Sequence, residues 1–186
     1  MAEFPLKEAT AGQDVKIEWM PFELRPYPTP TLRPDGAYLQ NAWRQSVYPI
    51  ARRMGVDIQL PTVSPQPHTR LAFEGLEFAK DRDRGDEYND RVMRAFFQES
   101  QDIGDPAVLT RLAAEVDLPA DEFRRALDTH EYAGRVEKLL RHAQDEMGIT
   151  GVPLFVIGNQ TLMGLQSRDA LITAIEQAGI YFHHRP

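Results

Sequence analysis

The sequence predicts an α/β protein in which a long helical block interrupts a small sheet-containing domain. Three observations support this fold class. Residues 15–20 alternate apolar and polar side chains, as a half-buried strand does. Helix-like spacing dominates residues 37–146, and an apolar hairpin with a helix after it closes the chain. We therefore expect residues 1–36 and 147–186 to form one discontinuous domain and residues 37–146 to form an all-helical insertion.

The first elements are short. Residues 6–12 are expected to end a helix near Gly12, and the strand at residues 15–20 follows. Four prolines between Pro26 and Pro34 remove backbone donors and exclude a helix or a central strand there. The chain should therefore leave the strand as a structured loop.

Several helices are expected next. Asp105 and Pro106 are a strong start signal, because aspartate caps a helix and proline suits its first turn. Pro49 is expected to kink or split the first helix, which ends at Gly55. The spacing of apolar residues predicts helices over residues 37–54, 69–80, 86–99, 106–116, 119–127 and 130–146.

The last elements are a hairpin and a helix. Pro153 to Ile157 is a short apolar run typical of a buried strand. Gly158 and Asn159 tolerate a positive φ and predict the turn, after which residues 160–165 return. Ser167 is expected to cap a final helix that ends at Gly179.

Composition limits the classes of function. The chain has 186 residues, 26% of them charged, with acids and bases mixed as on a solvated surface, and a net charge of −7. A net negative charge disfavours nucleic acid and anionic membranes as partners. No apolar run approaches the ~20 residues that span a bilayer, and the start lacks a secretory pattern, so a cytoplasmic location is expected. The absence of cysteine excludes a disulfide, a cysteine-ligated metal and a cysteine nucleophile within these residues.

Pro153 at the mouth of a strand needs a physical reason. One explanation is a cis bond after Val152, which would leave the main chain of Val152 free to pair with an extended guest chain. The alternative is a trans proline at the first residue of a strand, which is a common placement without function. Local sequence does not separate these two explanations.

The wider sequence context favours the cis proline over the trans proline. The end of the chain resembles the C-terminal half of a thioredoxin fold. It consists of Thr150-Gly151-Val152-Pro153 before an apolar strand, a Gly-Asn turn, a strand ending in Gly164, and a helix that opens with Ser167-Arg168-Asp169. More closely, it resembles the DsbA-like family of the FrnE type, in which Gly-Val-Pro is the cis-proline loop facing a catalytic Cys-x-x-Cys. Trp19 to Pro26 resembles the second strand of that family and its exit. Two further segments resemble its helical insertion, namely residues 69–79 and 95–106.

The resemblance implies a thioredoxin-like fold that lacks its first strand and its Cys-x-x-Cys, because residues 2–9 resemble the stretch just after that motif. Either the natural protein has about a dozen more residues before Met1, which we favour, or it is a truncated, redox-inactive relative. Loss of a central strand would expose both neighbouring edges, so a homodimer formed through an unpaired strand edge is a further expectation.

The resemblance also implies the function. The expected activity of the natural full-length protein is that of a thiol–disulfide oxidoreductase or isomerase acting on protein or small-molecule thiols, whereas these residues alone supply no redox chemistry. Substrate would bind at Thr150, Gly151, Val152 and Pro153, with Phe22, Leu24 and His68 as candidate groove residues. The alternatives are a glutathione-dependent isomerase or transferase like the kappa class, although residues 163–166 look more FrnE-like, and a redox-inactive binding module.

No cofactor and no metal are expected. His130 and His142 are twelve residues apart and do not share a helix face, and His183 with His184 belongs to a terminus. The charge run from Asp81 to Glu87 fails the spacing of a calcium loop. Ser46 and Ser100 have no histidine and aspartate arranged as in a catalytic triad.

Overall fold

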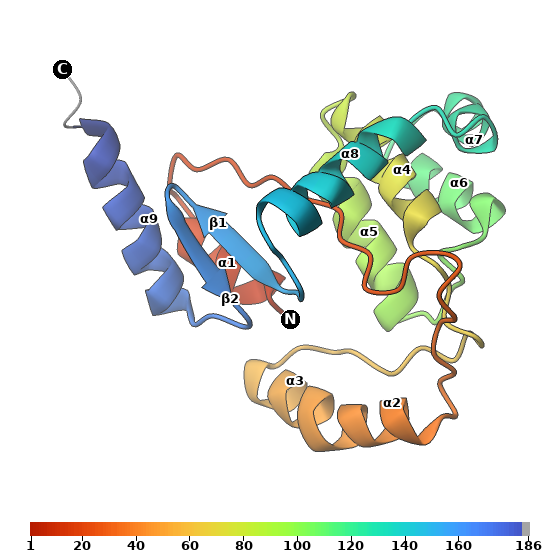
Figure 1. Cartoon of the computed structure of the whole chain (residues 1–186), viewed down its shortest axis with the longest axis horizontal. Helices are drawn as coiled ribbons and strands as arrows, with labels where there is room; N and C mark the ends of the chain where they lie inside the picture. Colours follow the sequence, from red (N-terminus) through yellow and green to blue (C-terminus); the bar gives the residue numbers. More distant parts are fainter. Residues whose placement is uncertain (184–186) are drawn as a thin grey trace. The chain divides into compact units, whose positions relative to one another are not determined.

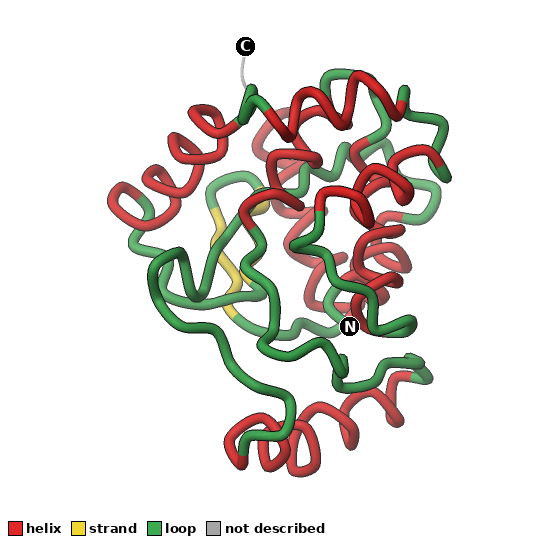
Figure 2. The backbone as a smooth tube through the Cα atoms, turned by 90° about the vertical axis from the view of Figure 1, so that its right-hand side faces the viewer, coloured by secondary structure: helices red, strands yellow, loops and turns green. Residues whose placement is uncertain are grey.

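The structure is a computed structural model that describes the main chain of residues 1–183 and the side chains of residues 1–179. The chain divides into two compact units. The hairpin unit combines residues 1–18 with the chain from Ile149 onward, and the helical unit runs from Trp19 to Gly148. The expected boundaries of the insertion, residues 37 and 146, stay a prediction. Figure 2 shows how far helices outweigh strands in both units.

The hairpin unit contains α1 (Glu3–Thr10), β1 (Leu154–Ile157), β2 (Gln160–Met163) and α9 (Arg168–His183). β1 and β2 pair antiparallel, with Leu154 opposite Met163 and Ile157 opposite Gln160. The positive φ of the turn falls on Gly158, at 61°. This position suits a two-residue turn whose first central residue is glycine. α9 packs against both α1 and β1 (Figure 1). Its Leu171 and Ala174 are buried.

Two expectations for this unit are wrong. Residues 15–20 form no strand, because a strand requires a neighbouring chain for its ladder of hydrogen bonds and no described segment pairs with them. Gly179 does not end α9, which continues to His183. The reason is that Gly179 lacks the positive φ that terminates a helix at glycine. His183 and His184, which are expected to belong to a terminus and not to a metal site, lie outside the residues whose side chains the structure describes.

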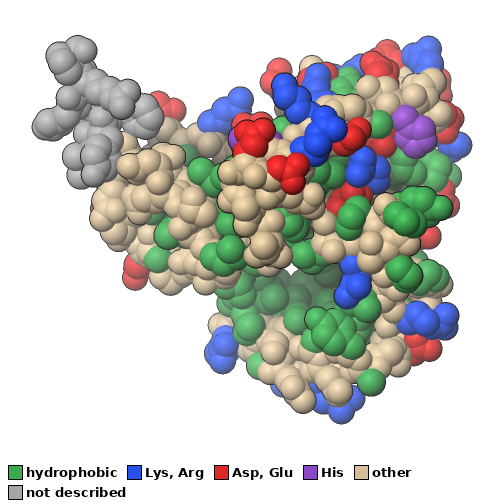
Figure 3. All heavy atoms as spheres, in the orientation of Figure 1, with side chains coloured by type: hydrophobic (Ala, Val, Ile, Leu, Met, Phe, Trp, Pro, Cys, Tyr) green, Lys and Arg blue, Asp and Glu red, His purple; other side chains and the backbone are tan. Residues whose placement is uncertain are grey.

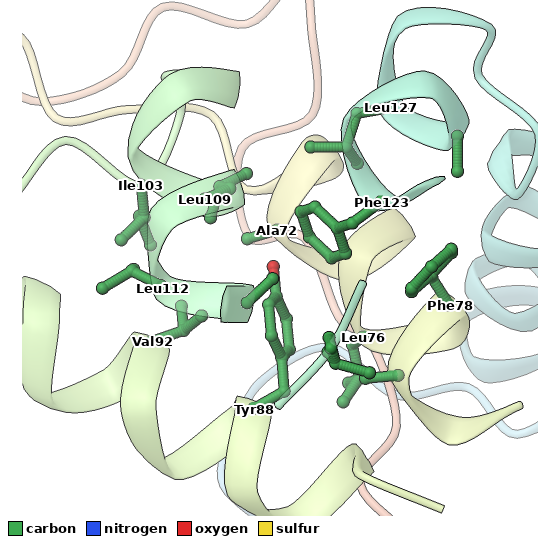
Figure 4. Packing of buried hydrophobic residues seen from close by; sticks show 14 of the residues in the cluster. Ala72, Leu76, Phe78, Tyr88, Val92, Ile103, Leu109, Leu112, Phe123 and Leu127 are labelled. Atoms are coloured by element: carbon green, nitrogen blue, oxygen red, sulfur yellow. The ribbon is translucent and has the colours of Figure 1, made fainter. Parts of the chain in front are cut away.

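The helical unit is built around a core on α4. This core is formed by α4 (Arg70–Lys80), α5 (Gly85–Phe97), α6 (Pro106–Ala114) and α7 (Ala120–Asp128). Tyr88, Phe78 and Phe123 are each at most 2% exposed and pack as a cluster of aromatic rings (Figure 4). Apolar residues spaced three and four apart give each helix the buried face that makes this packing possible.

The predicted helix starts are partly correct. Asp105 caps α6, since its Oδ1 accepts a hydrogen bond from the Ala107 amide at 2.7 Å. The helix expected from His130 begins later, as α8 (Ala133–Arg141), and continues as the π-helix η2 (His142–Glu146). His130 has a φ of 53°, a left-handed conformation that a helix interior does not allow.

Residues 37–54 form one rod of three pieces, namely α2 (Ala37–Ala42), the π-helix η1 (Trp43–Val47) and α3 (Tyr48–Met54). Pro49 neither splits nor ends this rod. The π-helix η1 ends two residues before Pro49. Proline has no backbone N–H and so interrupts the regular hydrogen bonding of an α-helix, and the wide turn of η1 accommodates this interruption. Gly55 ends α3 with a φ of 66°, as expected.

Candidate substrate-binding site

The first part of the site is the chain that enters β1. The bond between Val152 and Pro153 is cis. The Pro153 carbonyl accepts a hydrogen bond from the Gly164 amide at 2.8 Å and so continues the pairing of the hairpin by one residue. Val152 precedes this last pair and is 48% exposed. Within the part of the chain that the structure describes, neither its N–H nor its carbonyl has a hydrogen-bond partner.

The side chains around Val152 are apolar on the solvent side. Because β-strand side chains alternate, Val156 and Met163 share one face of the hairpin, and Val152 and Leu165 flank the two strands at its open end. Val156 and Met163 are 54% and 56% exposed, whereas the opposite face packs on α9. Val152 and Leu165 are 48% and 40% exposed. Residues 149–166 contain no acidic, basic or histidine side chain. Thr150 is exposed and Gly151 half-buried, so the whole approach to β1 is uncharged and accessible.

The second part of the prediction, Phe22, Leu24 and His68, falls in the helical unit. Phe22 is half-buried, and Leu24 is 67% exposed. The His68 ring does not cap α4. Its Nδ1 lies 3.1 Å from the Arg25 carbonyl, and its ring contacts Tyr27 edge to face. The structure thus brings His68 next to the 22–27 loop, and Thr150 to Pro153 form a separate set in the other unit.

Glu23 and Arg70, which no sequence pattern indicates, hold this loop in place. Glu23 is only 4% exposed, and its carboxylate accepts hydrogen bonds from Arg70 Nε at 3.1 Å and Nη2 at 2.8 Å. This hydrogen bond is the largest cause that raises the pKa of Arg70. A buried acid paired with a basic residue on the distant helix α4 is the kind of signal that only the folded contacts reveal, because 47 residues separate the partners.

A shallow cavity of about 440 Å³ lies beside His68. Its polar lining comes from Thr31, Ser64, Gln66, His68, Arg70, Asp102 and Asp105. Both aspartates already accept backbone hydrogen bonds, Asp102 from Gly104 and Asp105 from Ala107. Arg70 is engaged by Glu23. The cavity therefore offers few free polar groups, and its residues mainly hold loops together.

The described residues contain no group of histidine and acidic side chains able to hold a metal. Ser100 Oγ accepts a hydrogen bond from the Thr62 amide at 3.2 Å and has a structural partner. None of the described helices is both long enough and apolar enough to cross a membrane. What the site offers chemically is a main-chain N–H and a carbonyl at Val152 that have no partner among the described residues.

A β-hairpin followed by a helix, α9, that packs on both α1 and β1, together with a large helical segment between α1 and the hairpin, is the arrangement of a thioredoxin-type α/β fold. Solved structures share it. The probable DsbA oxidoreductase of Streptomyces coelicolor superposes with a TM-score of 0.75, 22% identity and coverage of 100% of this chain and 85% of that one. The 2-hydroxychromene-2-carboxylate isomerase superposes with a TM-score of 0.71 and 16% identity, and the match covers 98% of this chain and 89% of that one. These two likenesses establish the fold.

The model of the DSBA-like thioredoxin domain matches residues 1–176. The chain belongs to this family. Among curated proteins, the uncharacterized protein YwbO of Bacillus subtilis is 48% identical over 170 residues, which are 91% of this chain and 85% of YwbO. The sequence-based recognition of the DsbA-like family is thereby confirmed.

Proposed function

We propose that the chain is the substrate-binding portion of a thiol–disulfide oxidoreductase or isomerase of the FrnE type. The observation that carries this proposal is the free main chain of Val152 at the open end of the hairpin. An extended substrate segment would donate to the Val152 carbonyl and accept from its N–H, and so add a short strand to the edge. Pro153 has no N–H, so Val152 is the residue next to β1 that can offer both groups.

The redox step needs two thiols, and none of these 186 residues is a cysteine. We assign that step to cysteines that the natural full-length protein would supply. The first thiolate attacks one sulfur of the substrate disulfide and releases the other as a thiolate. The second thiolate then displaces the bound sulfur. The protein dithiol becomes a disulfide, and the substrate gains two electrons and two protons.

Binding is tested by NMR on the ¹⁵N-labelled chain. The probe is an unstructured apolar peptide in which serine replaces cysteine, so that no covalent step contributes. We expect shifts and slower hydrogen exchange at residues 150–152, and unchanged amides at Gly158 and Asn159, at the far end of the hairpin. Uniformly unchanged amides at millimolar peptide would refute the proposed binding edge.

The redox step is tested separately, by the codons upstream of Met1. An in-frame Cys-x-x-Cys, together with insulin reduction by the longer product, supports the step. Absence of that motif removes the redox claim and leaves a redox-inactive binding module, provided that the peptide binds.

The alternative that the sequence resemblance leaves open is a glutathione-dependent isomerase or transferase like the kappa class, and one of the structures that share the fold is an isomerase. Glutathione carries two carboxylates and an amine, and residues 149–166 contain no charged side chain to pair with them. We therefore favour polypeptide over glutathione. Shifts at residues 150–152 with millimolar glutathione, but none with the peptide, would reverse this preference.

A further inference from the structure

The rod of residues 37–54, here named the basic helix, reverses the sign of the chain's charge locally. Its charged residues are Arg44, Arg52 and Arg53, and no acidic residue occurs between Asp35 and Asp57. The chain as a whole carries −7. All three arginines are exposed. Figure 3 shows basic side chains along the rim of the segment that holds α2 and α3.

These three arginines have no structural task of the kind that Arg91 and Arg135 have on other helices. Arg91 holds Glu99 at 3.0 Å, and Arg135 holds Asp81 at 2.6 Å. By contrast, the side chains of Arg44, Arg52 and Arg53 form no ion pair or hydrogen bond with any residue between 1 and 183 that the structure describes. The helix dipole favours Arg52 and Arg53 at the end of α3, but Arg44 lies two turns earlier and gains nothing from it.

The basic helix is held in place from its other side. Trp43 is 8% exposed and packs edge to face on Tyr48, with ring centroids 5.4 Å apart, and against Phe97 at 6.2 Å. The Tyr48 hydroxyl accepts a hydrogen bond from the Leu60 amide at 3.2 Å. Since these contacts fix the apolar side, the arginines project from a preorganised scaffold, and binding would not require this helix to fold first.

The exposed composition matches a protein interface. Tyr38 is 68% exposed on the same rod, and tyrosine and arginine are the residues that interfaces favour. The rod contains arginine but no lysine, and the arginine fork pairs with carboxylates through two parallel hydrogen bonds. We propose that the basic helix is a docking surface for an acidic segment of a partner protein.

A protein partner fits better than a nucleic acid. The net charge of −7 repels a long polyanion over its whole length, whereas a short acidic segment meets only the local positive field. The stacked aromatic platform typical of single-strand binding is also lacking, because Trp43 is buried and Tyr38 stands as the exposed ring of the rod.

The test measures the fluorescence anisotropy of a fluorescein-labelled ten-residue peptide of alternating glutamate and aspartate, at low salt. The variant R44Q/R52Q/R53Q should bind about tenfold more weakly than the parent chain. The matched control R94Q/R124Q/R141Q makes the same change in net charge, but it removes arginines that pair with Asp90, Asp128 and Glu137. Its affinity should change less than about threefold.

Far-UV circular dichroism of each variant establishes that its helices persist. Three outcomes overturn the proposal: no binding by the parent chain, equal loss in the two triple variants, or tighter binding of a ten-nucleotide single-stranded DNA than of the acidic peptide. The variant R44K/R52K/R53K keeps the charge and loses the fork, and an affinity between those of the parent and the glutamine variant supports carboxylate recognition. The experiment involves no residue of the Val152 site, so its result is independent of the proposed function.

Discussion

Gly75 lies in the middle of α4 at the centre of the helical core, and its replacement by alanine should destabilise the protein. A Cβ at this position would press on the Tyr88 hydroxyl and lie 2.7 Å from Phe123 Cζ and 2.8 Å from Tyr88 Cζ. Neither ring has room to move, because Tyr88 is 1% exposed and Phe123 0%. Real Cβ atoms do not approach other atoms this closely, so the core has to shift.

The size of the effect is the difference between two terms. Alanine favours a helix over glycine by about 0.5–1 kcal/mol. Overpacking a well-filled core costs about 1–3 kcal/mol, and short contacts with two buried rings place Gly75→Ala at the upper end. We expect the free energy of unfolding to fall by about 2 kcal/mol.

Urea unfolding followed by tryptophan fluorescence measures this change. Both tryptophans, Trp19 and Trp43, belong to the helical unit, so the signal reports that unit alone. Gly134→Ala is the matched control. Gly134 also lies within a helix, α8, and its new Cβ would meet nothing within 4 Å, so this variant should gain about 0.5–1 kcal/mol.

Tyr88→Phe separates the clash from other causes. The Tyr88 hydroxyl is buried without a hydrogen-bond partner among the described residues, and burial raises the pKa of Tyr88. Its removal should stabilise the protein by about 1 kcal/mol and reduce the loss caused by Gly75→Ala. A Gly75→Ala protein as stable as Gly134→Ala would refute this account of the core.

Two other predictions concern pH and the hairpin turn. A hydrogen bond from Arg135 Nη1, at 2.6 Å, is the largest cause that lowers the pKa of Asp81 below its ordinary 3.8. A lowered folded-state pKa stabilises the fold above pH 3.8, and this contribution is lost as the pH falls through the folded-state value. Arg135→Gln should therefore be less stable than the parent chain at pH 7, and the gap in unfolding free energy should close below pH 3.8; a gap independent of pH would contradict the assignment. Gly158→Ala forces alanine to a φ of 61° and brings its Cβ to 3.0 Å from that of Ala178. Hydrogen exchange of the β1 and β2 amides should therefore accelerate about tenfold. The control Gly151→Ala places its Cβ in open space and should leave the exchange of these amides unchanged.

Local patterns predicted the elements that local interactions stabilise. The Asp105 cap, the turn at Gly158 and the buried faces of α4 and α5 each depend on residues close in sequence, and the structure has them where the pattern indicates. The strand expected at residues 15–20 failed for the opposite reason. Its alternation is genuine, but a strand forms only with a partner, and partners are set by distant parts of the chain.

In the candidate site, too, local sequence predicts some residues, and contacts between distant parts of the chain determine the others. Val152 and Pro153 could be singled out because Gly-Val-Pro before an apolar strand is a contiguous signal. The pair of Glu23 and Arg70 could not, because nothing near either residue indicates the other. Phe22 and Leu24 are predicted as groove residues, whereas the buried Glu23 between them is the residue that anchors the loop.

The hairpin unit is assembled from the two ends of the chain, and this has a consequence for synthesis on the ribosome. The helical unit, residues 19–148, is translated in full before any residue of β1 exists. Its helices make mostly near-neighbour contacts and can fold while elongation continues. α1 leaves the ribosome before the helical unit, yet it must wait for its packing partner α9, which is made after that unit. We expect chains that stop before residue 149 to contain a folded helical unit and an α1 without a partner.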